Sequence, residues 1–202
     1  MTGVEIGIEA RPIAGARISG TVFINRLENA IANVTIGAGP GVFPGVGFVA
    51  GGGAYRQRQN LEAIESKGVE LELSFRRDDW RFDASYAYTD ARVKGTGLAT
   101  ILNGLRPAQV AKHSASATLG WKRLSATARY IGPQFEDDQN ARQLRGAVTF
   151  DAVATVPVAK AISVTLRGEN LTDTRVEAAI SGAGIVERAS PRTIWVGVRF
   201  AG

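Results

Sequence analysis

The 202-residue sequence contains no cysteine, which excludes a disulfide framework and thiolate metal sites. Long apolar runs are also absent. No stretch approaches the roughly 20 residues that a membrane-spanning helix needs, and the mean hydropathy is −0.02. These absences exclude a helical membrane protein. They do not exclude one that crosses the membrane with strands, because lipid-facing and water-facing residues alternate along such strands and average to a modest hydropathy.

Neither positive nor negative charge is concentrated in one part of the sequence. Basic residues outnumber acidic ones by 24 to 19, but they are spread along the chain, whereas a nucleic-acid-binding face usually shows a basic stripe or a recognisable motif. We therefore expect no nucleic-acid partner. The residues after Met1 read directly as a strand and show no signal-peptide pattern.

Sets of residues that are typical of catalytic sites are missing as well. The sequence offers no Ser-His-Asp set, no cysteine nucleophile and no pair of carboxylates at a defined cleft. We predict neither an enzyme nor a bound cofactor.

The sequence is rich in alternation of apolar and polar residues. In PRTIWVGVRF, residues 191–200, every second side chain from Ile194 to Phe200 is apolar and the intervening ones are mixed, as on a strand with two different faces. A helix is an alternative for residues 61–73, but the strict period of two after Gly68 favours a strand. The same period predicts about nine strands, at residues 4–10, 17–36, 55–76, 80–89, 114–121, 124–130, 148–156, 162–167 and 191–200.

The connections between these segments alternate between short and long. Short turns follow residues 10, 75, 121 and 156, the last of them at residues 157–160. Long connections include residues 37–53, 94–107, 136–143 and 169–190. Outer-membrane barrels place short turns on one side of the membrane and long loops on the other. We therefore predict an all-β fold, an antiparallel up-and-down transmembrane β-barrel segment that forms an incomplete barrel.

Two other architectures fit the period of two. A soluble antiparallel β binding module would turn the apolar rows inward, and periodicity alone does not distinguish inside from outside. A small autonomous outer-membrane barrel with an adhesive or structural role would need an even number of strands. The sorting of the loops and the aromatic residue at position 200 favour the barrel segment.

Three motifs suggest a family. They are SKGVELEL at residues 66–73, ENLTD at residues 169–173 and SPRTIWVGVRF at residues 190–200. In order and spacing they resemble the carboxyl-terminal part of the barrel of TonB-dependent outer-membrane receptors, and the resemblance covers essentially the whole chain. It implies that residues 1–202 are the carboxyl-terminal portion of the barrel domain, without plug domain or signal peptide, in the outer membrane of a Gram-negative bacterium.

The resemblance also implies a function and partners. The function is that of a receptor or transporter fragment for TonB-energised uptake of a scarce nutrient, such as a ferric siderophore or cobalamin. The partners are outer-membrane lipid, the amino-terminal barrel and plug, the barrel-assembly machinery through the region of Phe200, and TonB only through the plug. Ala201 and Gly202 follow Phe200, whereas the family ends on the aromatic residue, so we expect less efficient assembly.

Candidate site residues lie in the first long loop and on the polar rows. The glycine-rich stretch at residues 37–53 lacks the Lys-Ser or Lys-Thr ending and the following helix of a phosphate loop, so we interpret it as a flexible extracellular loop without regular structure. In the family such loops contribute to ligand capture, which makes Phe43, Phe48 and Tyr55 candidate ligand contacts. Six charged residues are expected to face the lumen, where structural pairing is favoured over substrate contact: Glu70, Glu72, Arg129, Arg167, Glu169 and Arg199.

No metal site is predicted. His113 is the only histidine and has no second histidine or cysteine to share a metal, so we expect a plain strand residue. Glu136, Asp137 and Asp138 are oxygen donors of the kind that calcium prefers, but a solvated acidic loop is the favoured interpretation.

Overall fold

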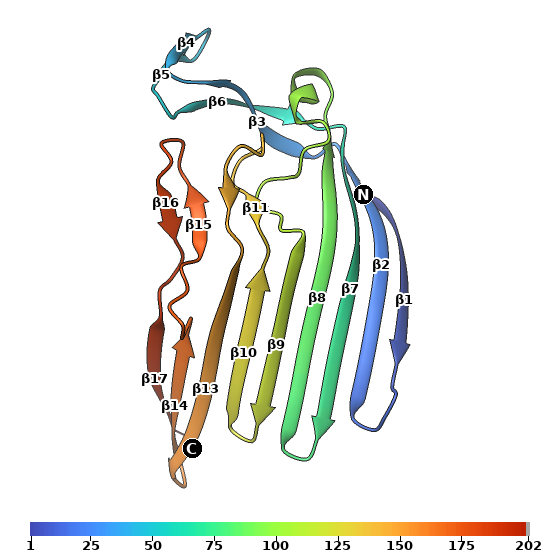
Figure 1. The fold of residues 1–202 in the computed structure, drawn as a ribbon, viewed down its shortest axis with the longest axis vertical. Coiled ribbons are helices and arrows are strands. Elements are labelled where there is room, and N and C mark those ends of the chain that lie inside the picture. Colours follow the sequence, from blue (N-terminus) through green and yellow to red (C-terminus); the bar gives the residue numbers. More distant parts are fainter. Residues whose placement is uncertain (201–202) are drawn as a thin grey trace.

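The protein is described by a computed structural model over residues 1–200 and is dominated by one curved sheet of nine antiparallel strands (Figure 1). Each strand pairs with the next strand of the sheet along the chain, so the topology is up-and-down and the prediction of nine strands is confirmed. Their bounds are β1 (Thr2–Ala10), β2 (Ala16–Glu28), β7 (Ala63–Arg77), β8 (Trp80–Lys94), β9 (His113–Trp121), β10 (Leu124–Ile131), β13 (Ala147–Ala159), β14 (Ile162–Glu169) and β17 (Thr193–Phe200).

Short turns lie at one end of the sheet and long connections at the other, as predicted (Figure 1). Asp78 and Lys122 lie in two-residue hairpin turns and adopt left-handed backbone angles, with φ of 51° and 50°. Two-residue turns of this kind match the twist of the paired strands. The turn end of the sheet is therefore compact.

The nine strands present their apolar rows on the same face, because the register pairs apolar positions with one another. This face is exposed: Ile6 is 74% and Val196 is 71% accessible. A continuous exposed apolar surface of this extent marks contact with another apolar phase, and it contradicts the soluble module. One row crosses seven strands through Ala10, Ile18, Leu73, Ala84, Ala117, Ala128 and Phe150.

The apolar face has the height of a membrane. On β8 the outward row starts at Trp80 and meets its first charge at Asp90. Ten residues extend about 33 Å along a strand, or about 25 Å when the strand tilts by about 40°, which matches the apolar band of outer-membrane barrels. Aromatic residues mark its two ends, with Trp80 and Trp121 near the turns and Tyr86 and Tyr88 near the loops.

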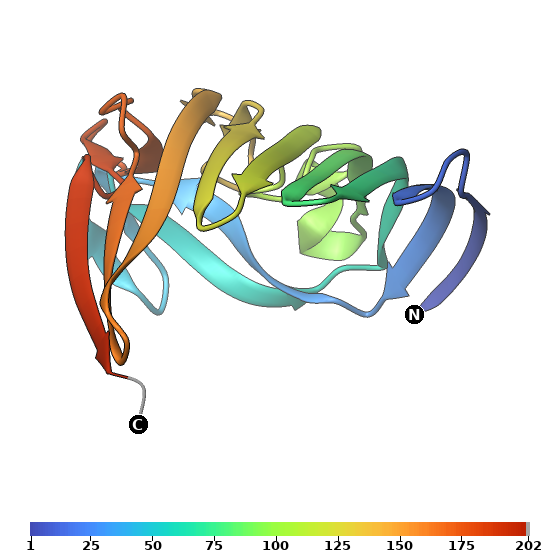
Figure 2. The ribbon, with the colours of Figure 1, turned by 90° about the horizontal axis from the view of Figure 1, so that it is seen from below.

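The long connections have structure of their own. The strands β3 (Ile31–Ala38) and β6 (Ala54–Asn60) form a hairpin that runs across the concave side of the sheet (Figure 2). The remaining elements are β4 (Gly41–Phe43), β5 (Gly47–Val49), the 3-10 helix η1 (Gly97–Leu102), β11 (Gln134–Phe135), β12 (Gln143–Leu144), β15 (Glu177–Ile180) and β16 (Val186–Arg188). Among residues 1–200, no helix has the length and apolar character to cross a membrane.

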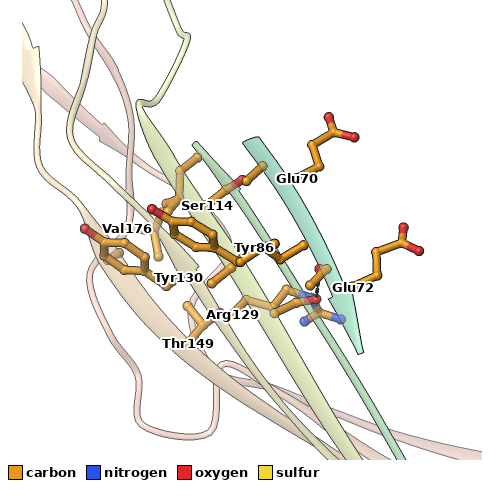
Figure 3. Close-up of a pocket in the computed structure, with 15 residues that line it drawn as sticks. Glu70, Glu72, Tyr86, Ser114, Arg129, Tyr130, Thr149 and Val176 are labelled. Atoms are coloured by element: carbon orange, nitrogen blue, oxygen red, sulfur yellow. Dashed lines mark hydrogen bonds between the residues drawn. The ribbon is translucent and has the colours of Figure 1, made fainter. Parts of the chain in front are cut away.

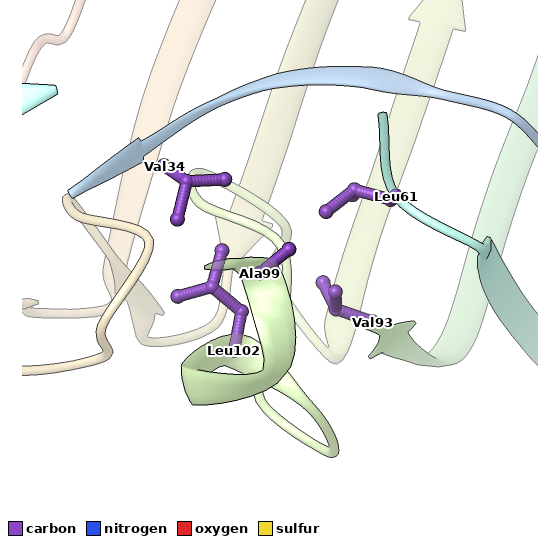
Figure 4. Close-up of a cluster of buried hydrophobic side chains, with 5 residues drawn as sticks. All are labelled: Val34, Leu61, Val93, Ala99 and Leu102. Atoms are coloured by element: carbon purple, nitrogen blue, oxygen red, sulfur yellow. The ribbon is translucent and has the colours of Figure 1, made fainter. Parts of the chain in front are cut away.

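A buried hydrophobic cluster lies at the loop end and not between layers of the sheet. Val34, Leu61, Val93, Ala99 and Leu102 pack the β3–β6 hairpin and η1 against the end of β8 (Figure 4). The sheet is thus apolar on the outside, and its compact core belongs to the loops.

Two predicted strands are interrupted. Residues 17–36 and 55–76 were each expected to form one strand, but β2 ends at Glu28, where Asn29 turns with φ of 53°, and β7 begins only at Ala63. Between them, β3 and β6 pair with each other outside the main sheet. The prediction was wrong because a hairpin beyond the end of the main sheet keeps the same period of two, so the pattern does not indicate a change of pairing partner.

Two loop predictions also need correction. Residues 37–53 contain the β4–β5 hairpin, whose turn is made possible by the left-handed glycines Gly45 and Gly47, with φ of 76° and 86°. The turn expected at residues 157–160 comes later, because β13 continues to Ala159. Pro157 is tolerated there since it lies beyond Ala154, the last β13 residue paired with β10, and beside a bulge in the pairing with β14.

Candidate functional site

The concave side of the sheet is lined by the polar rows. Hydroxyl groups pair across neighbouring strands in this lining, and such cross-strand pairs stabilise a sheet. The oxygen–oxygen distances are 2.9 Å for Ser85 and Ser116, 2.9 Å for Thr118 and Thr127, and 3.1 Å for Thr155 and Thr165. The strands therefore present a hydrogen-bonded polar wall opposite their apolar face.

Three of the six predicted lumen-facing residues lie around one cavity of about 460 Å³ on this wall (Figure 3). Glu70 and Glu72 project from β7, and Arg129 lies on β10, three strands away in the sheet, past β8 and β9. Glu72 accepts a hydrogen bond from Ser19, and Arg129 forms an ion pair with Asp151. Within residues 1–200, no ion pair or side-chain hydrogen bond involves Glu70, so its carboxylate is available to a partner.

The other three predicted residues lie elsewhere. Arg167 and Glu169 form an ion pair of 2.5 Å with each other, and the indole N–H of Trp195 donates to Glu169 at 3.3 Å. Arg199 is on β17, opposite Ser163, near the turn end of the sheet. The lining of a lumen by all six residues stays a prediction, because residues 1–200 form an open sheet.

The ENLTD motif closes the last long loop. Asn170 has left-handed backbone angles, with φ of 47°, and its backbone N–H donates to Asp151 at 2.8 Å. Its side-chain amide donates to the carbonyl oxygens of Thr174 at 2.9 Å and Ser190 at 3.4 Å, while its side-chain oxygen accepts from the Thr174 N–H at 2.9 Å. Asn170 therefore binds both ends of the loop together, which explains an asparagine at this position.

The long loops form a connected layer at the open end of the sheet. Thr35 in the β3–β6 hairpin donates its backbone N–H and its hydroxyl to the two oxygens of Asp138, at 2.6 and 2.8 Å. Arg145 donates through its backbone N–H and Nε to Glu177 of the last loop, at 2.8 and 2.7 Å. Sequence reasoning missed both contacts, because 103 and 32 residues separate the partners and no local pattern joins them.

The acidic residues at 136–138 are not a solvated acidic loop, contrary to the expectation. Asp137 is only 5% exposed and accepts hydrogen bonds from the backbone N–H groups of Gln139, Ala141 and Arg142, at 3.0, 3.0 and 2.6 Å. Burial would raise the pKa of Asp137, but these donors and the charge of Arg142 outweigh it and hold the pKa below its ordinary value of 3.8. Across residues 1–200, no group of three or more His, Cys, Asp or Glu is placed to hold a metal ion.

The aromatic candidates of the first loop do not form one cluster. The rings of Phe43 and Tyr55 lie 5.5 Å apart, and the Phe43 ring fills the space beside Gly37. Phe48 is 69% exposed on the neighbouring strand of the small hairpin. The structure therefore groups two of the three residues, and their role as ligand contacts stays a prediction.

His113 lies on the outward face at the loop end. Its Nδ1 is 2.8 Å from the hydroxyl oxygen of Tyr86, and its ring lies 5.2 Å from that of Tyr88. The sequence indicated a strand residue but gave no sign of this aromatic group, because the register between β8 and β9 brings the three rings together.

Comparisons with known proteins identify a family that this chain matches. The family model described as TonB dependent receptor-like, beta-barrel matches residues 1–171. The vitamin B12 transporter BtuB of Photobacterium profundum is 31% identical over 114 residues, which cover 56% of this chain and 18% of that protein.

Solved structures share the fold. The siderophore receptor PiuA from Acinetobacter baumannii superposes with a TM-score of 0.74 at 21% identity, over 98% of this chain and 28% of that one. The ferric yersiniabactin uptake receptor FyuA from Yersinia pestis gives a TM-score of 0.73 at 16% identity, over 98% of this chain and 29% of that one. The chain thus spans less than a third of the length of these relatives.

Proposed function

Because this chain belongs to the TonB-dependent receptor β-barrel family, whose members are receptors and transporters of the Gram-negative outer membrane, we propose that it forms part of the barrel wall of such a receptor. The observation that carries the proposal is that the apolar and polar faces of the sheet are reversed relative to those of a soluble β protein. The exposed face of the sheet, with Ile6 and Val196, is apolar, and its concave face holds Glu70, Glu72 and Arg129.

We further propose that residues 1–202 are the carboxyl-terminal portion of the barrel domain. In the described part of the chain, β1 and β17 each pair on one side only, and unpaired strand edges cannot remain in hydrocarbon. Nine is also an odd number of strands, whereas bacterial single-chain barrels have an even number. An amino-terminal part of the same protein would supply the remaining strands and the plug, and TonB would act through that plug.

The proposed cargo is a scarce nutrient such as a ferric siderophore or cobalamin. Support comes from the relatives, which are named as a siderophore receptor, a ferric yersiniabactin uptake receptor and a vitamin B12 transporter. Further support is the connected loop layer at the open end of the sheet, where Tyr55 on β6 packs against Phe43 on β4.

Isolated outer membranes of the producing bacterium test the proposal. In a denaturing blot with an antibody against residues 136–143, we expect a band several-fold larger than 21.4 kDa whose mobility shifts on heating. A heat-shifting band near 21.4 kDa would instead support a small autonomous barrel, and absence from the membrane fraction would contradict both.

The transport step is measured in the same cells. We expect deletion of the gene to abolish energy-dependent uptake of one of two probes, iron-55 supplied as ferric siderophore or cobalt-57 cobalamin. A protonophore should abolish the same uptake in the parent strain, since TonB-driven transport uses the proton gradient. Unchanged uptake of both probes after deletion would contradict the proposed cargo.

A further inference from the structure

The net positive charge of the chain lies at the turn end of the sheet. The chain holds 24 basic and 19 acidic residues, which gives a formal charge of +5. The four short turns, each taken with two strand residues on either side, span residues 9–17, 76–81, 120–125 and 158–163. These segments contain eight basic and three acidic residues, a difference of +5, so the rest of the chain is balanced with 16 of each sign.

The four turns lie along one edge of the sheet (Figure 1). The backbone N–H of Arg76 donates to the carbonyl oxygen of Gly15 at 2.8 Å, and the backbone N–H of Lys122 donates to that of Asp79 at 3.1 Å. These bonds join three neighbouring turns, and the fourth turn follows across the pairing of β10 with β13. The eight basic residues of the four segments therefore share one edge, which we call the basic rim.

The rim has more cations than nearby carboxylates. Five of its eight basic residues form ion pairs, four of them with the acidic residues of the same segments and Arg76 with Asp83. Within residues 1–200, no ion pair or side-chain hydrogen bond involves Arg81, Arg123 or Lys160, and all three residues are exposed. Arg123 and Lys160 lie in the turns themselves, whereas Arg81 is on the concave row. The rim thus keeps a surplus of positive charge at its surface.

The rim adjoins the aromatic residues at the lower edge of the apolar face. Trp80 and Trp121 are on the outward row beside the second and third turns, with ring centroids 6.0 Å apart. The Nζ of Lys122 lies 4.8 Å from the centroid of the Trp121 ring. Indole rings at the edge of an apolar band lie at the level of the lipid headgroups, so the ammonium group of Lys122 lies at that level too.

We propose that the basic rim binds the anionic headgroups of phospholipids in the membrane leaflet on the turn side. In outer-membrane barrels the short turns are periplasmic, so this is the periplasmic leaflet. Lysine and arginine near an anionic lipid surface are each attracted to it. An acidic protein is the other anionic partner to consider, but the contact of Lys122 with the lipid-facing Trp121 favours lipid. The inference rests on the proposed function, because it requires the sheet to be part of a barrel wall in the membrane.

A fluorophore on the β13–β14 turn measures the lipid composition at the rim. The 202 residues contain no cysteine, so Ala161→Cys provides a labelling site beside Lys160 in the full-length receptor, after replacement of any cysteine in the rest of the protein. The labelled receptor is reconstituted in phosphatidylcholine vesicles with a small fraction of a phospholipid that carries a nitroxide quencher near its headgroup. This phospholipid is either phosphatidylglycerol, which is anionic, or phosphatidylcholine, which has no net charge.

We expect the phosphatidylglycerol quencher to be at least about twofold more effective than the phosphatidylcholine quencher at low salt. The difference should shrink at high salt, because salt screens exposed charges. The rim variant, Arg123→Gln with Lys160→Gln, should remove at least about half of the difference. The matched control is Arg58→Gln with Arg175→Gln, which removes the same charge from exposed arginines of the loop layer and should leave the difference unchanged.

Equal quenching by the two lipids at low salt would overturn the proposal and favour an acidic protein as the partner of the rim. An unchanged difference in the rim variant, or an equal loss in the control variant, would also overturn it. A receptor that is present in the outer membrane and shifts on heating but shows equal quenching contradicts this inference alone. Absence of the receptor from the outer membrane contradicts the proposed function.

Discussion

Gly68, the first residue of the GVELEL stretch, makes a contact that no larger residue fits. A β-carbon at this position would lie 2.1 Å from the Tyr88 carbonyl oxygen and 2.6 Å from the Phe23 ring. Phe23 is only 8% exposed, although it lies on the concave, mostly polar face. The ring of Phe23 therefore covers the glycine, and the packing of β2 against β7 explains this residue of the motif.

We expect Gly68→Ala to destabilise the full-length receptor by about 1–3 kcal/mol, the usual cost of overpacking a close contact. The measurement is urea-induced unfolding in detergent, followed by tryptophan fluorescence. Gly197→Ala is the matched control, since Gly197 is also in a strand and a β-carbon there meets no atom within 4 Å. Equal destabilisation by the two substitutions would show that the cost comes from glycine replacement in general and not from this contact.

At the scale of elements, the loop at residues 132–146 is organised around the side chain of Asp137. Asp137 accepts three backbone N–H groups, and its neighbour Asp138 joins the loop to the β3–β6 hairpin. A carboxylate accepting several backbone donors has a pKa below its ordinary value, as Asp137 has. The loop therefore depends on an ionised Asp137.

This dependence predicts a pH effect with a definite sign. Because the pKa of Asp137 is lowered in the folded state, the ionised carboxylate contributes its full stabilisation of the loop at pH values above its ordinary pKa of 3.8. This contribution is lost as the pH falls through the folded-state pKa. We expect hydrogen-exchange protection of the Gln139, Ala141 and Arg142 amides, corrected for intrinsic rates, to be constant from about pH 7 to pH 5 and to fall below about pH 4.

The variant Asp137→Asn is the control for this effect. It keeps an oxygen acceptor but cannot ionise, so protection should be lower than in the parent protein at neutral pH and nearly independent of pH. A parent loop whose protection does not change down to about pH 2 would contradict the prediction.

The whole molecule is inverted relative to a soluble β protein. Its apolar face is outside, its hydroxyl ladders and charges line the concave side, and its compact hydrophobic cluster belongs to the loop layer. Hydrocarbon takes the place of the second layer that a soluble sheet needs. The two faces should therefore respond in opposite ways to an added charge.

Ala126 and Ser125, neighbours on β10, test this difference. Ala126 is on the outward row beside Leu119 and Ala152, and Ser125 is on the concave row beside Gly120 and Val153. We expect Ala126→Arg to cost about 1–3 kcal/mol of folding free energy in lipid, since an arginine on the lipid face is destabilising and Ala126, in register with Phe82, lies between the midplane and the turn-end edge of the apolar band. We expect Ser125→Arg to cost less than about 1 kcal/mol. Refolding of the full-length receptor into vesicles measures both, and equal costs would contradict the assigned faces.

Much of the sheet was predictable from the sequence because its physics is local. Side chains alternate across a strand with a period of two, so the apolar rows, the nine strands and the sorting of loops follow from residue order alone. The same alternation assigned Glu70, Glu72 and Arg129 to one face. His113 was also assigned correctly to a strand.

Only the tertiary structure decided which strands pair beyond the membrane and which loops contact each other. The period of two is the same in β2 and β3, so it did not show that β3 leaves the sheet to pair with β6. The contact between Thr35 and Asp138 and the contact between Arg145 and Glu177 join residues far apart in the chain. The sequence determined the two faces of the sheet, because the alternation of apolar and polar side chains is a property of each strand by itself. Long-range packing determined the loop layer, because that layer exists only once several connections have folded together.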